Sequence, residues 1–156
     1  IFFESSSTKI DKDAYTFKML NKEWDQEKWK ELILRLHDDY LIIQSVHNKS
    51  IKFEGTYYAE EKFDFRTACA LMNNCDLFIG QEGGFSHAAA ALNKKAVVYF
   101  GGWIHPKTTG YEFHENLYYE HPQSPCGVRG AKCYHCEEAR KSISVNDFEK
   151  KIELLI

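Results

Sequence analysis

The sequence lacks the features that would place the chain in several large classes of protein. No apolar run approaches the roughly 20 residues that a membrane-spanning helix requires, and no secretory leader pattern opens the chain. The net charge is only −3, so no basic field argues for a nucleic-acid partner. We therefore expect a cytoplasmic protein that binds no nucleic acid and makes at most peripheral contact with the inner face of the membrane.

The sequence also lacks the even number of cysteines that a disulfide framework would have. Five cysteines are an odd number, which disfavours a secreted disulfide framework and favours a reducing compartment. Three of them, Cys126, Cys133 and Cys136, follow the spacing C-x6-C-x2-C in a predicted polar, Cys-rich loop over 121–137. One interpretation is a structural zinc site with His121 as the fourth ligand and His135 close by. The other is a set of reduced thiols or a local disulfide, and our expectation is that the protein needs no cofactor.

What is present describes one ordinary globular unit. The chain has 156 residues, 44% of them hydrophobic and 28% charged, and contains no repeat or low-complexity segment. We expect a single domain over 1–156. Because the chain begins with Ile1 rather than Met, and IFF reads like a strand already under way, we also expect a fragment or a processed chain.

Short apolar strands alternate with helical periodicity along the sequence. Strands are predicted at 1–3, 40–46, 76–80, 96–100 and 116–120, and helices at 25–37, 64–74, after Gly84 and at about 145–155. The run YLIIQSV at 40–46 is typical of a strand buried on both faces. This alternation predicts an α/β fold, a Rossmann-like parallel sheet with helices on both faces, whose ligand lies beyond the carboxyl ends of the strands.

The stretch DLFIGQEGGFSHAAAALNKKAVVYFGG at 76–102 places two glycines where a strand turns into a helix. Helix N-termini bind phosphate, and residues without a Cβ let a diphosphate approach the amides. Gly83 and Gly84 would form this cradle, and His87 would lie one turn into the helix. Glu82 suits a ribose hydroxyl, a ligand amine or a role in holding the loop. A plain strand-to-helix turn with a packed histidine is the alternative.

The same stretch resembles the signature of the heptosyltransferase-type glycosyltransferases (family 9, GT-B fold), with the match on Glu82, Gly83, Gly84 and His87. The family usually has aspartate and Ser or Thr where this chain has Glu82 and Gly83. The segment NKEWDQEKWKELI at 21–33 is similar to the family's lysine segment, and SPCGVRGAKCYHCEEARKSISVNDFEKKIELL resembles its Cys-containing tail and closing helix.

The resemblance implies which residues meet the donor. Lys22 and the hydroxyl loop after the first strand, Ser6, Ser7 and Thr8, would contact donor phosphate. Lys107 and Thr108, in the loop GGWIHPKTTGYEFH at 101–114, would face the donor sugar or diphosphate, with an exposed aromatic loop as the alternative. The catalytic residues stay unknown, because the family's base lies in an N-terminal acceptor domain that this chain lacks.

The implied function is the nucleotide-sugar binding half of an inverting, metal-independent glycosyltransferase of surface-glycan or lipopolysaccharide assembly. Its partners would be a nucleotide-diphospho-sugar and a glycan or lipid-linked acceptor, the latter reached through the missing domain. As an isolated fragment the chain would be inactive. Two alternatives stay open: half of a GT-B-like nucleotide-sugar epimerase, and a non-catalytic zinc- or nucleotide-binding module.

Overall fold

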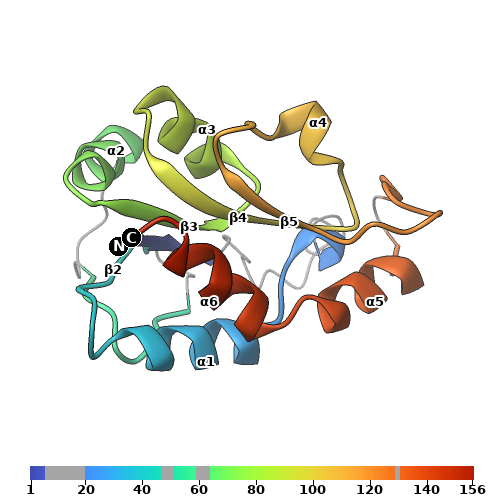
Figure 1. The fold of residues 1–156 in the computed structure, drawn as a ribbon, viewed down its shortest axis with the longest axis horizontal. Helices are drawn as coiled ribbons and strands as arrows, with labels where there is room; N and C mark the ends of the chain where they lie inside the picture. The colour runs from blue at the N-terminus through green and yellow to red at the C-terminus, as the bar shows by residue number, and fades with distance from the viewer. Residues whose placement is uncertain (6–19, 47–50, 59–63, 129–130) are drawn as a thin grey trace.

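The fold is built on one parallel β-sheet, seen in a computed structural model that describes residues 1–5, 20–46, 51–58, 64–128 and 131–156 (Figure 1). Five strands form the sheet in the order β2-β1-β3-β4-β5, and all neighbours run parallel. The strands are β1 (Phe2–Glu4), β2 (Ile43–Gln44), β3 (Leu77–Gln81), β4 (Lys95–Gly101) and β5 (Glu115–Tyr118). The predicted α/β class is confirmed.

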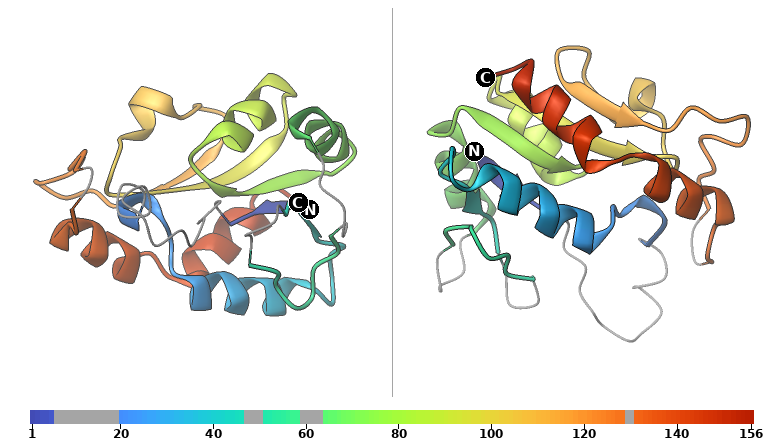
Figure 2. Two further views of the ribbon diagram at one scale, coloured as in Figure 1. Left: turned by 180° about the vertical axis from the view of Figure 1, so that it is seen from behind. Right: turned by 60° about the horizontal axis from the view of Figure 1, so that its bottom comes forward.

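Helices cover both faces of this sheet. On one face lie α1 (Gln26–Leu36), α5 (Tyr134–Ser142) and α6 (Val145–Glu153), and on the other lie α2 (Phe65–Asn73), α3 (Gly84–Ala91) and the single turn α4 (Pro106–Thr109) (Figures 1 and 2). A 3-10 turn, η2 (Leu20–Lys22), precedes α1. Within the described ranges, no helix combines the length and the apolar character that crossing a membrane would demand.

The two layers follow from alternation along the central strands. In β4, Val97 and Tyr99 pack toward α1 and α6, whereas Val98 and Phe100 pack toward α2 and α3. A strand that is apolar at every position is what burial on both faces requires. This arrangement explains why AVVYF has no polar side.

The boundaries of α1 and α6 were readable from capping residues. The Asp25 carboxylate accepts a hydrogen bond from Glu27 N (2.9 Å), and Ser144 and Asp147 form a reciprocal capping box. The apolar stripe of α1 is buried, including Trp29. Its ring packs against Phe148 of α6, with ring centroids 5.0 Å apart, which joins the two helices under the sheet.

Two segments differ from the prediction. The run at 40–46 forms only β2, an edge strand, because the segment 51–58 rather than a helix covers it. The Gln44 side chain donates to Ile51 O (2.6 Å) and accepts from Phe53 N (3.0 Å), so polar contacts secure that cover. The predicted Cys-rich loop ends at Cys133, where α5 begins. Since α5 reads YHCEEARKS, it lacks the apolar repeat that would have revealed it.

Candidate functional site

The strand order places a topological switch point between β1 and β3. In a sheet ordered 2-1-3-4-5, the chain reverses direction across the sheet between these strands, and ligands of such folds lie outside their carboxyl ends. Glu4 ends β1, and Glu82 directly follows β3. The turn η2 reaches the same edge, since the Lys22 Nζ donates to Glu82 O (3.2 Å).

Lys22 and Glu82, which are 60 positions apart, form a shielded ion pair at this edge. Nζ of Lys22 lies 3.0 Å from Oε2 of Glu82, and the side chains are only 14% and 10% exposed. The Trp103 ring lies beneath the ammonium group, 5.7 Å from Nζ to the ring centroid. The lysine is thus held in one place and retains a face toward solvent. Of the three roles considered for Glu82, this geometry supports holding the loop.

The start of α3 is open at the two glycines. A Cβ built on Gly83 meets no atom of the described residues within 4 Å, and one on Gly84 makes only an ordinary 3.8 Å contact with Phe65. The Gly83 N–H donates to Ser86 Oγ (3.1 Å). To the residues that the structure describes, the amides of Gly84 and Phe85 donate no hydrogen bond, so these two are the available donors.

The other predicted contacts are more dispersed. His87 is exposed and pairs, within the described chain, with the Tyr111 hydroxyl (3.0 Å) rather than with Lys22 or Glu82. Lys107 and Thr108 are exposed on α4, beyond the carboxyl end of β4. Ser6, Ser7 and Thr8 lie outside the described residues. The described structure therefore joins Lys22, Glu82 and the glycine turn, and leaves His87 at the side of α3.

A second constellation lies under the loop after β5. Four ligand-type side chains bring one atom each to within 4.8 Å of one another, and we call them the Cys/His cluster: Cys126, Cys133, His135 and Cys136. The three predicted cysteines do meet. The histidine that lies with them is His135 and not His121, which was predicted as the fourth ligand; the His121 Nδ1 accepts instead from Gln123 N (3.1 Å).

The thiols of this cluster differ in acidity. Burial raises the pKa of Cys126 and of Cys136. Burial also acts on Cys133, but hydrogen bonds from the Cys136 backbone and from the neighbouring thiols outweigh it and lower its pKa. Cys133 is accordingly the first of the three to ionise.

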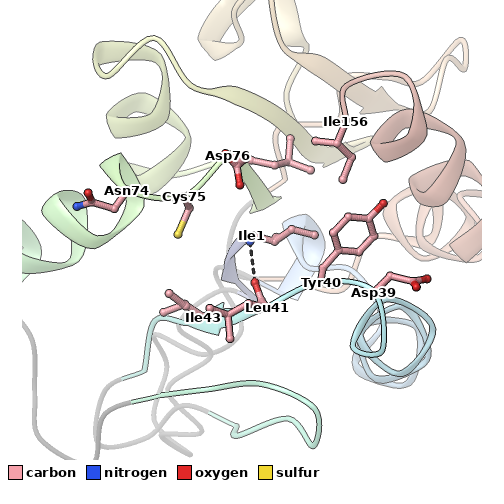
Figure 3. Close-up of a pocket in the computed structure, with 10 residues that line it drawn as sticks. Ile1, Asp39, Tyr40, Leu41, Ile43, Asn74, Cys75, Asp76 and Ile156 are labelled. Carbon is pink, nitrogen blue, oxygen red and sulfur yellow. Dashed lines mark hydrogen bonds between the residues drawn. The ribbon is translucent and has the colours of Figure 1, made fainter.

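A cavity lies at the opposite end of the sheet, away from the candidate site. It has a volume of about 390 Å³ and lies at the amino ends of β1 and β3, between Ile1, Tyr40, Asp76 and Ile156 (Figure 3). The Ile1 nitrogen donates to Leu41 O (2.8 Å) across its floor. Ligands of parallel sheets bind at the other end, so this cavity is separate from the candidate site.

Comparison with known proteins decides the family. The sequence profile of glycosyltransferase family 9 (heptosyltransferase) matches residues 14–137. The chain belongs to this family. The match includes Lys22, the glycine turn of α3 and all of the Cys/His cluster. Among curated protein sequences, no significant match was found.

Solved structures agree with this family 9 fold. The iron-containing dodecameric glycosyltransferase TibC of enterotoxigenic E. coli superimposes with a TM-score of 0.73 at 16% identity, covering 99% of this chain and 45% of that one. The E. coli ADP-heptose lipopolysaccharide heptosyltransferase II gives 0.67 at 17%, with coverage of 99% and 45%. E. coli heptosyltransferase WaaC with ADP gives 0.63 at 15%, with coverage of 98% and 43%. The chain thus spans less than half the length of these relatives.

Sequence reasoning missed the roles of Asn21 and Trp103 in this family 9 chain, and it named His135 only as a neighbour of the cysteines. Asn21 is 4% exposed and holds the loop before Cys133, and Trp103 supports Lys22. His135 completes the Cys/His cluster. Asn21 and His135 stand one position from residues that were identified, so adjacency to a motif was the only available signal. Their contacts join segments more than 10 residues apart.

Proposed function

We propose that the chain is the donor-binding half of an inverting, metal-independent glycosyltransferase that uses a nucleotide-diphospho-sugar. The observation that carries this proposal is the shielded Lys22, held at the carboxyl edge of β3 beside the open amides of Gly84 and Phe85. A cation and two free N–H groups, with no Cβ in front of them, form a site for a diphosphate. Family membership makes an activated sugar the expected bearer of that diphosphate.

Such a site would act on the leaving group. As the glycosidic bond to the diphosphate breaks, negative charge builds on the phosphate oxygens, and fixed donors stabilise that charge without reorganising. Lys22 would supply the full charge and the α3 amides would supply partial charge. The base that deprotonates the acceptor would come from the other half of such an enzyme, outside the 156 residues described, and the acceptor would be a glycan or a lipid-linked glycan. We therefore expect no sugar transfer by the chain alone.

The ligands of the solved relatives suggest which nucleotide to test first. WaaC has been solved with ADP, and TibC with ADP-D-β-D-heptose. We propose ADP-heptose as the first donor to test, beside UDP-, GDP- and CMP-sugars. We propose that the protein acts in the reducing environment of the cytoplasm, with at most peripheral membrane contact.

Calorimetric titration of the chain with these nucleotides tests the proposal. Lys22→Ala should weaken the binding of the preferred nucleoside diphosphate by roughly 10-fold or more, the value of one charge-assisted hydrogen bond. Lys30→Ala, an exposed lysine on α1, is the matched control and should bind like the original chain. Equal losses in both variants, or no nucleotide binding by the chain at all, would refute the proposed function.

A further inference from the structure

The Cys/His cluster has the composition of a closed metal site. Its four ligand atoms lie within 4.8 Å of one another. Thiolates about 2.3 Å and an imidazole nitrogen about 2.0 Å from a tetrahedral ion lie roughly 3.5 Å apart, so small side-chain movements would complete the sphere. Four protein ligands leave no open position, which is the mark of a structural site rather than a catalytic one.

The protonation of His135 points to the same conclusion. The Ser124 Oγ donates its proton to Tyr119 O (2.8 Å) and lies 2.6 Å from the His135 Nε2. Because its only proton is committed, Ser124 accepts from Nε2–H, which leaves the lone pair on Nδ1. Within the described chain, this Nδ1 is buried and has no hydrogen-bond partner. An orphaned basic nitrogen whose sister nitrogen is anchored is the usual arrangement of a metal-binding histidine.

The glycine after β4 makes room for this ring. A Cβ on Gly102 would lie 2.6 Å from Cε1 and 3.0 Å from Nε2 of His135. The Gly102 carbonyl also accepts from Cys126 N (3.1 Å). Gly102 therefore helps to position two members of the cluster. Its carbonyl binds the backbone of Cys126, and its lack of a side chain leaves room for the His135 ring.

We propose that the Cys/His cluster binds one tetrahedral divalent ion, Zn²⁺ or Fe²⁺, through its three sulfurs and the His135 Nδ1. On binding, each of the three thiols loses its proton to solvent, and no electron is transferred. The ion closes the loop between Cys126 and Cys133 without taking part in sugar transfer.

Asn21 and Trp103, which both lie next to Lys22, form hydrogen bonds with this loop. The ion therefore has a second role, and this role rests on the proposed function. Next to the lysine in sequence, Asn21 donates to Val128 O (3.0 Å) and to Ala131 O (2.8 Å), and its Oδ1 accepts from Cys133 N (3.1 Å). Beneath the lysine, the Trp103 Nε1 also donates to Val128 O (3.0 Å). The ion thereby fixes the loop, and the loop fixes the position of the phosphate-binding lysine.

A disulfide is the competing chemistry for two of the thiols. The sulfurs of Cys126 and Cys136 lie 2.9 Å apart. A disulfide between them would involve neither Cys133 nor the His135 Nδ1. It would therefore not explain why a third thiol and a buried nitrogen without a hydrogen-bond partner lie beside them. The metal site accounts for all four groups.

Elemental analysis tests the site independently of any nucleotide. Chain purified under reducing conditions with Zn²⁺ and Fe²⁺ present should retain about one ion after dialysis, and Co²⁺ in its place should give thiolate charge-transfer absorption. Cys136→Ser and His135→Gln should lose the ion, whereas Cys69→Ser, a thiol outside the cluster, should keep it. The cobalt spectrum of the unaltered chain needs no variant to fold. No retained ion and no charge-transfer band, or a Cys126–Cys136 disulfide in the reduced preparation, would overturn the proposal.

The link to Lys22 is tested by measuring ADP binding before and after the ion is removed by a chelator. Removal should weaken ADP binding about 10-fold in the original chain, and zinc should restore it. Asn21→Ala should keep the ion but bind ADP as weakly as the metal-free chain. Unchanged affinity on removal would overturn the link alone. Absence of binding in both forms by ADP and by every other nucleotide of the titration series would overturn the proposed function and the link, while the metal content would still decide the site.

Discussion

Two glycine pairs follow neighbouring strands of this protein, and they do opposite things. Gly83 and Gly84 follow β3, where added Cβ atoms would enter space that the described residues leave open. Gly101 ends β4 and Gly102 follows it, and Cβ atoms added to them would lie 2.8 Å from the Tyr99 hydroxyl and 2.6 Å from the His135 ring, respectively. Packing therefore demands the second pair, whereas nothing in the fold demands the first.

The difference shows how a ligand site can be told from a structural turn. A glycine that the protein itself fills serves the fold, and its loss should appear as lost stability. A glycine in front of empty space and free amides serves something outside the chain. By this criterion the turn after β3 is the one that we propose faces the ligand, and the turn after β4 faces the Cys/His cluster.

Filling the second pair should cause the largest change. Gly102→Val would press its side chain against His135 and Ala139, and should lower the free energy of unfolding by about 3 kcal/mol through overpacking. Urea unfolding measures this loss. Gly83→Val is the matched control, with little expected change in stability. A Gly102→Val chain as stable as the original would show that the contact with His135 is not a constraint.

Filling the first pair should affect binding and spare the fold. Gly84→Val should weaken nucleoside diphosphate binding roughly 30-fold, about 2 kcal/mol, because its methyl groups would occupy the space before the α3 amides. Titration gives the affinity, and a melting temperature close to that of the original chain confirms the fold. Undiminished affinity in a folded Gly84→Val chain would remove the turn from the site.

Gly101 should show an intermediate effect that comes from the backbone. Its φ is +60°, at a register shift between β4 and β5, and residues other than glycine resist this conformation. Gly101→Ala should therefore cost roughly 1.5 kcal/mol of stability. Denaturant unfolding of Gly83→Ala, whose backbone is extended, provides the comparison; equal losses in the two variants would contradict this account.

The smallest expected change concerns the charge beside the first pair. Glu82→Gln keeps an oxygen near Lys22 but removes the ion pair, and should strengthen binding of inorganic diphosphate by about 1 kcal/mol or less. Parallel titrations with diphosphate and ADP separate the two roles of Glu82. Weakened ADP binding with stronger diphosphate binding would identify Glu82 as a ribose ligand instead of a holder of Lys22.

Much of the fold could be predicted from local signals. The all-apolar AVVYF, the stripe of Trp29, Leu32 and Leu36, and the Ser144 cap each depend on periodicities and capping rules that act within one element. The run at 40–46 misled because apolar composition does not reveal which strand lies at an edge. In the candidate site, the sequence predicted Lys22, Glu82 and the glycines at 83 and 84. It did not predict that Lys22 and Glu82 form an ion pair.

The sequence by itself determined the element types, the α/β class and the family, because hydrophobic period, caps and a glycine motif are properties of neighbouring residues. Only the tertiary structure decided which of two similar glycine turns stays open, and that His135 rather than His121 meets the cysteines. It also decided that Asn21 and Trp103 tie the Cys/His cluster to Lys22. These contacts join segments that only the packing of strands and loops brings together, so no local pattern could encode them.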